Sequence, residues 1–182
     1  MPYPTPTNTF ELYRDGGTTL EIAAMVRMVL VVRGFRARLD ERLRAINQSA
    51  ARMETLSAII NMQGPVSQSD VARRLRVEGA TVTRMVDLLS KEGLVERSPH
   101  PSDRRVNLLR VTEKGEGELR RIFRVYDAAR SELLAEFAKE EIAQVHLLTG
   151  KMLAQLDMMS SIGPDHGEAQ IGDLPQRDRL RD

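Results

Sequence analysis

The sequence predicts a mainly α-helical protein with one small β-hairpin. Through most of the chain, apolar residues recur at the three-and-four spacing of amphipathic helices. Between residues 94 and 111 this spacing gives way to two short runs rich in Val and Leu, which are typical of strands. A turn with two prolines and two arginines separates these runs. Together the patterns predict helices arranged around a single hairpin.

The stretch before the hairpin predicts two short helices joined by a tight connection. Ser67 is a good N-cap for the first helix, residues 68–75, and Asp70 three residues later completes a capping box. The second helix spans about residues 80–92, and we expect Gly79 to make the turn that precedes it. Its apolar stripe consists of Val82, Met85, Val86 and Leu89, and Gly93 ends it.

The hairpin that follows has a basic tip. Two strand-like runs, residues 94–97 and 106–111, flank the turn at residues 98–105. A helix, a turn, a second helix and then a hairpin make a winged helix-turn-helix. An α-helix about 10–12 Å wide fills the major groove of DNA, and a cationic hairpin tip suits the narrower minor groove. The predicted partner is therefore double-stranded DNA.

The same residues carry a family resemblance. The run L-L-S-K-E-G-L-V-E-R, then D-R-R, then L-x-V-T-x-x-G resembles the signature of the MarR family of bacterial transcriptional regulators, and it covers Leu88 to Gly115. The resemblance implies a winged helix set between dimerisation helices. It also implies a crevice between these parts in which phenolic and aromatic carboxylate ligands bind. The tails of this chain are longer than a minimal member of the family needs.

The pattern divides the chain into five parts. We expect an irregular N-terminal arm over residues 1–17 and a first dimerisation helix over 18–48. The winged helix-turn-helix module spans 49–111, C-terminal dimerisation helices span 112–162, and a disordered tail spans 163–182. The long helices carry more apolar surface than a monomer of this size can bury, which predicts a homodimer.

The helices of these parts have predicted bounds and inward faces. Within the module, a helix over residues 50–62 should turn Met53, Leu56, Ile59 and Ile60 inward. The C-terminal helices should run over residues 112–138 and 140–161, and Leu133 and Phe137 should lie on the apolar face of the first.

Composition excludes several classes of function. The chain has a net charge of +1 and no cysteine, so disulfides, thiolate catalysis and Cys-ligated metals are excluded. Three well-separated histidines and no phosphate-binding or zinc motif argue against an enzyme, a metal site or a cofactor. With no signal peptide and no membrane-spanning run, we expect a cytoplasmic protein. The module from residue 65 to 111 holds nine basic and six acidic residues, a net +3 that suits phosphate contact.

Four residues of the two short helices are predicted DNA contacts. Thr81, Thr83 and Arg84 lie on the side of the second helix away from its apolar stripe, and Ser67 begins the first helix. Short hydroxyls near a helix N-terminus can reach phosphates, and an arginine can bind guanine through two hydrogen bonds. The alternative is an ordinary polar helix face.

Three residues at the tip of the hairpin resemble the D-x-R wing motif of the family. By that resemblance, Asp103 steadies the hairpin by pairing with an arginine, and Arg105 first and Arg104 second reach into the minor groove. The alternative is a solvated cluster of charges on a turn.

Arg36 interrupts an apolar line on the first long helix. A seven-residue spacing places it in register with Ile22, Val29 and Leu43, where a core residue is expected. A buried guanidinium needs a partner. One interpretation is an ion pair with a neighbouring helix, or a side chain that reaches the helix edge. The other is a carboxylate-binding site in the crevice that the family resemblance implies, with Met53 or Leu56 as its apolar wall.

The leading hypothesis is a MarR-type repressor. It would bind a pseudo-palindromic operator as a homodimer and leave it when a small aromatic carboxylate or phenolic effector binds. A second hypothesis is a DNA-binding regulator with no effector, either architectural or constitutive. A third is a winged helix used only for contacts between proteins, and salt-dependent binding to duplex DNA separates it from the first two.

Overall fold

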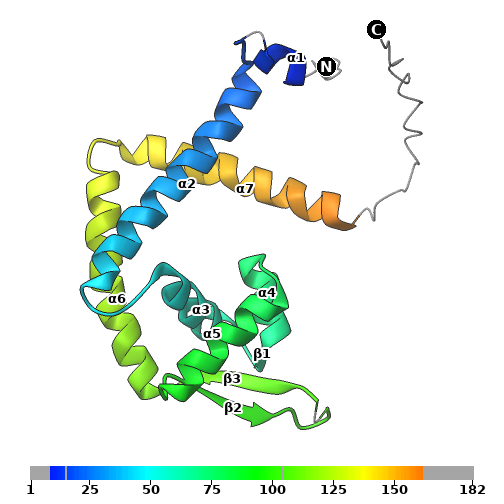
Figure 1. Ribbon diagram of the computed structural model, residues 1–182, viewed down its shortest axis with the longest axis vertical. Helices are drawn as coiled ribbons and strands as arrows, with labels where there is room; N and C mark the ends of the chain where they lie inside the picture. The colour runs from blue at the N-terminus through cyan, green and yellow to red at the C-terminus, as the bar shows by residue number, and fades with distance from the viewer. Residues whose placement is uncertain (1–8, 15, 104, 162–182) are drawn as a thin grey trace, which may run out of the picture. The chain divides into compact units, whose positions relative to one another are not determined.

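The computed structural model describes residues 9–14, 16–103 and 105–161, and in these it has seven helices and three strands (Figure 1). The chain divides into two compact units, Met1–Ala135 and Glu136–Asp182, and each is described by itself. No helix in these residues is long and apolar enough to cross a membrane. The first unit contains α1 Thr9–Arg14, α2 Leu20–Arg44, α3 Ala50–Asn61, β1 Val66–Ser67, α4 Gln68–Leu75, α5 Gly79–Lys91, β2 Val95–Pro99, β3 Asn107–Val111 and α6 Glu113–Leu133, and the second contains α7 Lys139–Ser161.

Side-chain caps start four helices close to where the sequence predicts them. The Thr19 side chain accepts a hydrogen bond from the amide of Ile22 at the start of α2. The Ser49 side chain accepts one from the amide of Arg52 at the start of α3. The predicted capping box of α4 is confirmed, because Ser67 and Asp70 each accept from the other's backbone amide. Thr112 caps α6 by accepting from the amide of Gly115 at 3.0 Å.

The sheet is antiparallel, with strand order β1-β3-β2. β2 and β3 form the predicted hairpin, in a register that pairs Val95 with Val111 and Pro99 with Asn107. β1 was not predicted, because two residues are too short to show an alternating pattern. Its Val66 lies opposite Leu109, so β1 joins the start of α4 to the hairpin.

The core is aliphatic and lies where α3, α4, α5, the sheet and α6 meet. Only the C-terminal half of α2 reaches it, through Leu39 and Leu43. Phe35, Phe123 and Tyr126 pack edge to face at its margin, with centroids 6.0 and 6.2 Å apart. The largest fully buried side chains are Leu39, Leu43, Leu56, Leu89, Leu94, Ile122, Val71, Val82 and Val86.

The turn between α4 and α5 differs from the prediction. Arg76, not Gly79, adopts the left-handed conformation, with φ of 55°, and its amide bonds back to the carbonyls of Ala72 and Arg73. Gly79 is instead the first residue of α5. The Cβ atom of Arg76 makes this conformation cost about 1–2 kcal/mol, and the two hydrogen bonds of its amide offset part of that cost. Gly93, with φ of 72°, follows α5 as predicted.

Other expectations about the helices were also wrong. Residues 9–14 form α1 instead of an irregular arm, and Ile60 at the end of α3 is 43% exposed. The helix expected over residues 112–138 ends at Leu133, so Phe137 lies outside it and is 49% exposed. A new helix begins because the side chain of Glu141 accepts a hydrogen bond from the Ala138 amide at 2.8 Å.

Gly115 lies at the closest approach between α6 and the connection from α5 to β2. A Cβ atom built on it would lie 2.1 Å from the carbonyl oxygen of Leu94 and 2.8 Å from a methyl group of Val111. The same carbonyl accepts a hydrogen bond from the Thr112 amide at 3.0 Å. This contact explains why the L-x-V-T-x-x-G pattern ends in glycine.

We predict that Gly115→Ala lowers the free energy of unfolding by about 2–3 kcal/mol, because a backbone carbonyl cannot yield to the new methyl group. Gly117→Ala is the matched control on the same helix, since its Cβ would meet nothing within 4 Å. It should instead stabilise α6 by about 0.5–1 kcal/mol through helix propensity. Urea unfolding of both variants measures this, and equal effects would contradict the account of Gly115.

Candidate nucleic-acid interface

α5 has one buried face and one exposed face. Val82, Val86 and Leu89 are at most 1% exposed and hold the helix against the core. Thr81, Thr83 and Arg84 project from the exposed face. Arg84 forms no ion pair with any residue that the structure describes, so its guanidinium keeps all its donors.

Two of the predicted DNA contacts also have structural roles, Thr83 between the two short helices and Ser67 at the start of α4. The hydroxyl of Thr83 lies 3.0 Å from the Gly79 carbonyl oxygen and 3.3 Å from the side-chain oxygen of Gln68, the first residue of α4. Ser67 is half-buried, and both its amide and its hydroxyl donate to Asp70, at 2.9 and 2.7 Å. The structure therefore gives Ser67 the role of a cap that positions α4, and its donors are not available to a phosphate.

The tip of the hairpin is held by Asp103. Its side-chain oxygen accepts from the amide of Arg105 at 3.0 Å and from the Nε–H of the same residue at 3.2 Å. The Arg105 side chain is nevertheless 91% exposed, and its two terminal amino groups have no partner among the described residues. Arg104 lies outside the described residues. The structure thus pairs Asp103 with the arginine to which the sequence analysis assigned the groove contact.

An ion pair that the sequence did not predict holds the C-terminal end of α5. Glu92, which follows the last residue of α5, accepts two hydrogen bonds from the guanidinium of Arg52 on α3, one of them 2.8 Å long. The Arg52 side chain is only 11% exposed. Hydrogen bonding to Arg52 lowers the pKa of Glu92 below its usual value of 4.5, against a smaller opposing effect of burial.

Three further residues extend this pair toward α6. The Nε–H of Arg52 donates to the side chain of Gln48 at 2.7 Å, and Gln48 in turn donates to Glu118 on α6 at 3.1 Å. Lys114 donates to the backbone carbonyl of Glu92 at 2.8 Å. The network was missed because its members are separated by up to 70 residues and no local motif links them.

Arg36 lies at the surface and pairs with a neighbouring helix. Its guanidinium is 2.7 Å from Glu54 on α3, and its side chain is 47% exposed. The two residues line a cavity of about 340 Å³ together with Met53, Phe35 and Tyr126. Of the two residues predicted for the apolar wall, Met53 lines this cavity, whereas Leu56 is fully buried in the core.

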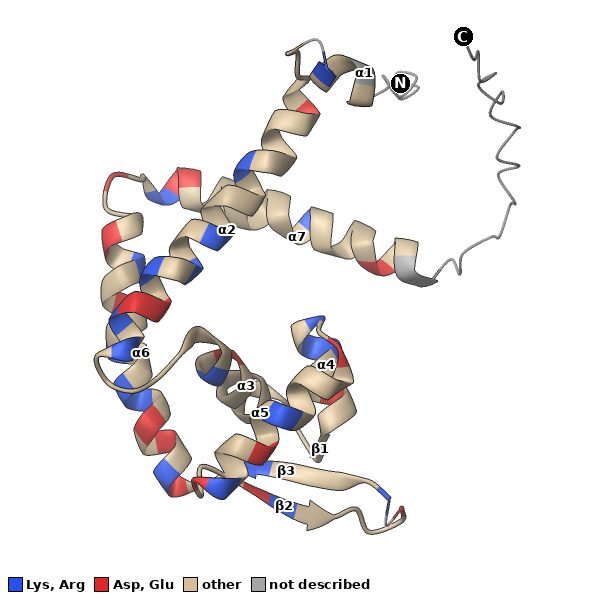
Figure 2. Cartoon of the chain, viewed as in Figure 1, with Lys and Arg blue, Asp and Glu red and all other residues tan. Residues whose placement is uncertain are grey.

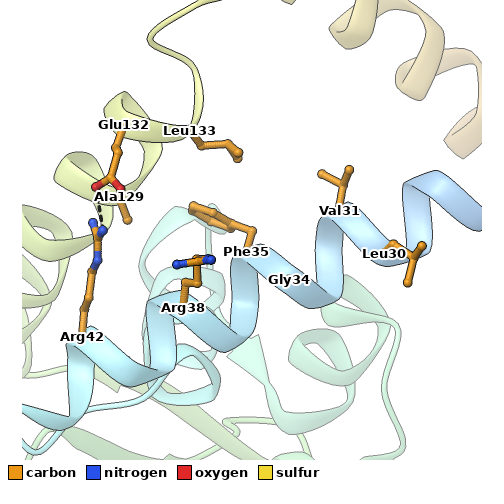
Figure 3. Close-up of a pocket in the computed structure, with 9 residues that line it drawn as sticks. All are labelled: Leu30, Val31, Gly34, Phe35, Arg38, Arg42, Ala129, Glu132 and Leu133. Carbon is orange, nitrogen blue, oxygen red and sulfur yellow. Dashed lines mark hydrogen bonds and ion pairs between the residues drawn. The ribbon is translucent and has the colours of Figure 1, made fainter.

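A second cavity, of about 410 Å³, lies between α2 and α6 (Figure 3). Phe35 and Leu133 project into it from the two helices, and Gly34 leaves room on α2. An ion pair of 2.6 Å between Arg42 and Glu132 joins the two helices at one end. This cavity contains none of the predicted DNA contacts.

The architecture is that of a winged helix-turn-helix, a class built to bind duplex DNA. Residues 50–106 match the model of the MarR family. Wild-type MarR from E. coli in its apo form has 26% sequence identity and a TM-score of 0.62, over 75% of this chain and 99% of that one. The transcriptional regulator PA3341 has 28% identity and a TM-score of 0.65, over 72% and 96% of the two chains.

The regulator BldR from Sulfolobus solfataricus is similar to the same degree. It has 26% identity and a TM-score of 0.66, over 74% of this chain and 95% of that one. Residues 50–106 thus resemble the MarR family, and the fold of the chain is similar to that of solved transcriptional regulators, among them MarR itself. This is a family of transcriptional regulators and not of enzymes.

We predict that Glu92→Gln lowers the free energy of unfolding by about 2 kcal/mol at pH 7, because it leaves the guanidinium of Arg52 buried without its countercharge. The loss is smaller than for a fully buried pair, since Glu92 is 39% exposed. Urea unfolding at a series of pH values measures it.

The effect of pH on this variant has a definite sign. A carboxylate whose pKa is lowered by folding stabilises the protein above its unfolded pKa, and this stabilisation is lost as the pH falls through the folded pKa. The difference between wild type and Glu92→Gln should therefore shrink as the pH drops below about 4.5. Glu96→Gln is the control for the size of the effect: hydrogen bonding to Arg110 lowers the pKa of Glu96 in the same way, but this pair is exposed, so its loss at pH 7 should be much smaller. A difference that stays constant with pH would rule out the proposed role of Glu92.

Proposed function

We propose that this protein is a transcriptional repressor that binds a pseudo-palindromic operator as a homodimer. α5 would lie in the major groove and the hairpin tip would reach the adjacent minor groove. The observation that carries the proposal is the exposed face of α5, where the guanidinium of Arg84 has no protein partner among the described residues. Thr81 and Thr83 lie beside it, and Arg105 gives a second cationic point on the hairpin of the same module.

A solved relative supports the DNA partner. A point mutant of MarR from E. coli has been crystallised with operator DNA, and it has 26% identity to this chain and a TM-score of 0.65. Much of the charge in the present winged module is neutralised internally: Arg73, Arg97 and Arg110 pair with Asp70, Asp87 and Glu96. Arg84, which has no such partner among the described residues, is therefore the strongest candidate for a base contact.

Exposed apolar helices support the homodimer. Each unit taken by itself leaves large apolar side chains uncovered: in α2 these extend from Leu20 to Val32, and in α7 from Ile142 to Met159. Contiguous apolar surface of this extent marks an interface. A second copy of the same chain supplies a matching surface, and a two-fold dimer would present two copies of α5 to one face of the DNA.

The Arg36 cavity supports an effector site. A small aromatic carboxylate would replace Glu54 on the guanidinium of Arg36, and its ring would pack on Met53 and the edge of Tyr126. A phenol would use the same apolar wall. Such a ligand would release the operator only if it binds more tightly to the arrangement of the dimer that cannot span two half-sites.

The same ion pair favours the alternative function, a DNA-binding regulator without an effector. Because Glu54 already satisfies Arg36, the guanidinium needs no ligand to balance its charge. In that case the pair only joins α2 to α3. The two functions differ in whether an aromatic acid changes the affinity for the operator.

We predict that Arg105→Ala weakens operator binding by about 1–3 kcal/mol and lowers the dependence of log Kd on log salt by about one. The fold should survive, since the Arg105 side chain is almost fully exposed. Fluorescence anisotropy with a duplex over a range of salt concentrations measures both quantities. Arg120→Ala, on α6, removes the same charge elsewhere and should change neither. Equal affinities for wild type and a folded Arg105→Ala would remove Arg105 from the interface.

We predict that Arg36→Ala retains operator affinity and loses the response to an aromatic acid such as salicylate, because the carboxylate loses its cationic partner. Arg33→Ala is the matched control, since Arg33 is exposed on the same helix and does not line the cavity. The measurement is operator affinity with and without the acid. A response in Arg36→Ala equal to that of wild type would leave Arg36 as one half of a structural ion pair.

A further inference from the structure

Two cavities adjoin along the seam between the end of α2 and α6. One, of about 530 Å³, has a floor that includes Ile46, Val125 and Ala128. The other, of about 620 Å³, is polar and lies against the last residues of α5 and the first turns of α6. Because both are lined by Ala45, Ile46 and Arg121, we treat them as one seam cavity with an apolar half and a polar half.

The polar half carries excess positive charge. Its lining contains four cationic residues and two acidic ones. Each acidic residue forms an ion pair with one of the cations: Glu92 pairs with Arg52, and Glu118 pairs with Arg121 at 2.9 Å. The other two cationic residues, Lys91 and Lys114, form no ion pair with any described residue, although Lys114 donates to a backbone carbonyl.

Donors remain unused around both halves. Arg121 directs one terminal amino group at Glu118, which leaves its other amino group and its Nε–H. At the rim of the apolar half, Arg124 has no ion pair among the described residues, and Arg42 pairs across the seam with Glu132. Figure 2 shows the basic residues that are spaced along α2 and α6.

We propose that the seam cavity binds an anionic amphiphile. Its phosphate or carboxylate group lies between Lys91, Lys114 and Arg121, and its apolar body covers Ile46, Val125 and Ala128. Charge-assisted hydrogen bonds hold the head group, and a concave apolar surface with a few well-placed cations is the usual form of a small-molecule site. The net charge of the polar half matches a dianion such as an alkyl phosphate.

This site is separate from the proposed effector cavity. The seam cavity and the Arg36 cavity share no lining residue. The proposal therefore does not depend on DNA binding or on a response to aromatic acids, and it can be tested with the protein alone.

Calorimetric titration of the full chain with butyl, hexyl and octyl phosphate, all as monomers, tests the proposal. We expect one site per chain and an affinity that rises about fourfold for each added methylene until the apolar half is filled. Inorganic phosphate and octanol each supply only one part of the ligand, so both should bind far more weakly than octyl phosphate. An affinity that does not change with chain length would overturn the proposal.

Two variants separate the halves. Lys114→Gln should weaken octyl phosphate about tenfold by removing one charged contact, whereas Arg120→Gln on the same helix should not. Ala128→Glu should abolish the increase in affinity with the length of the alkyl chain. Ser131→Glu adds the same charge outside the cavity, so this increase in affinity should remain. Affinities in Lys114→Gln and Ala128→Glu that equal those of their controls would overturn the proposal.

An anionic lipid bilayer presents the same head-group chemistry. Sedimentation with phosphatidylglycerol vesicles distinguishes this source from a free ligand. The free-ligand proposal expects no binding to vesicles. Binding to vesicles that Ala128→Glu abolishes would assign the cavity to membrane lipids and overturn it.

Discussion

The position of α5 depends on the ion pair between Arg52 and Glu92. Glu78, which precedes α5, makes no side-chain capping hydrogen bond, so apolar packing and this pair at the other end set the orientation of the helix. Arg52 comes from α3, inside the winged module, and Gln48 and Glu118 connect it to α6. A helix that reads DNA must be held rigidly relative to its partner in a dimer, because half-sites are spaced by helical turns of the duplex. The pair thus links the placement of Arg84 to the long helix α6.

A second constraint acts at the same place. Thr112 caps α6, and its hydroxyl donates to the Gly93 carbonyl at 2.7 Å. Its amide donates to the Leu94 carbonyl, and Gly115 allows α6 to pass close to that same carbonyl. The end of α5, the start of β2, the end of β3 and the start of α6 therefore meet within a few residues. Any displacement of α6 would therefore move both elements that we propose to contact DNA, the α5 face and the hairpin tip. Such a junction gives an effector bound near α2 and α6 a physical route to the DNA.

The sequence predicted what local chemistry determines. The capping box of Ser67 and Asp70, the buried stripe of α5 and the hairpin follow from spacing alone, and so does the exposed position of Arg84. What depended on distant residues was missed. The Arg52–Glu92 pair joins positions 40 apart, and β1 is defined only by its partner β3. For Arg36, one interpretation of the sequence was an ion pair with a neighbouring helix, but the pattern could not show that the partner is Glu54. Periodicity also could not separate Met53, which lines a cavity, from Leu56, which is fully buried, because it shows only that a residue faces inward.

In the proposed complex, two copies of α5 related by two-fold symmetry read the operator. Selection of bound duplexes from a random pool, followed by footprinting, tests it most directly. The account predicts an inverted repeat whose half-sites are centred about 10–10.5 base pairs apart, or a multiple of that, and protected by a particle of two chains. In the Arg84→Ala variant, discrimination should be lost at one symmetric pair of positions. A single unsymmetrical site bound by one chain, or a sequence preference unchanged in Arg84→Ala, would contradict it.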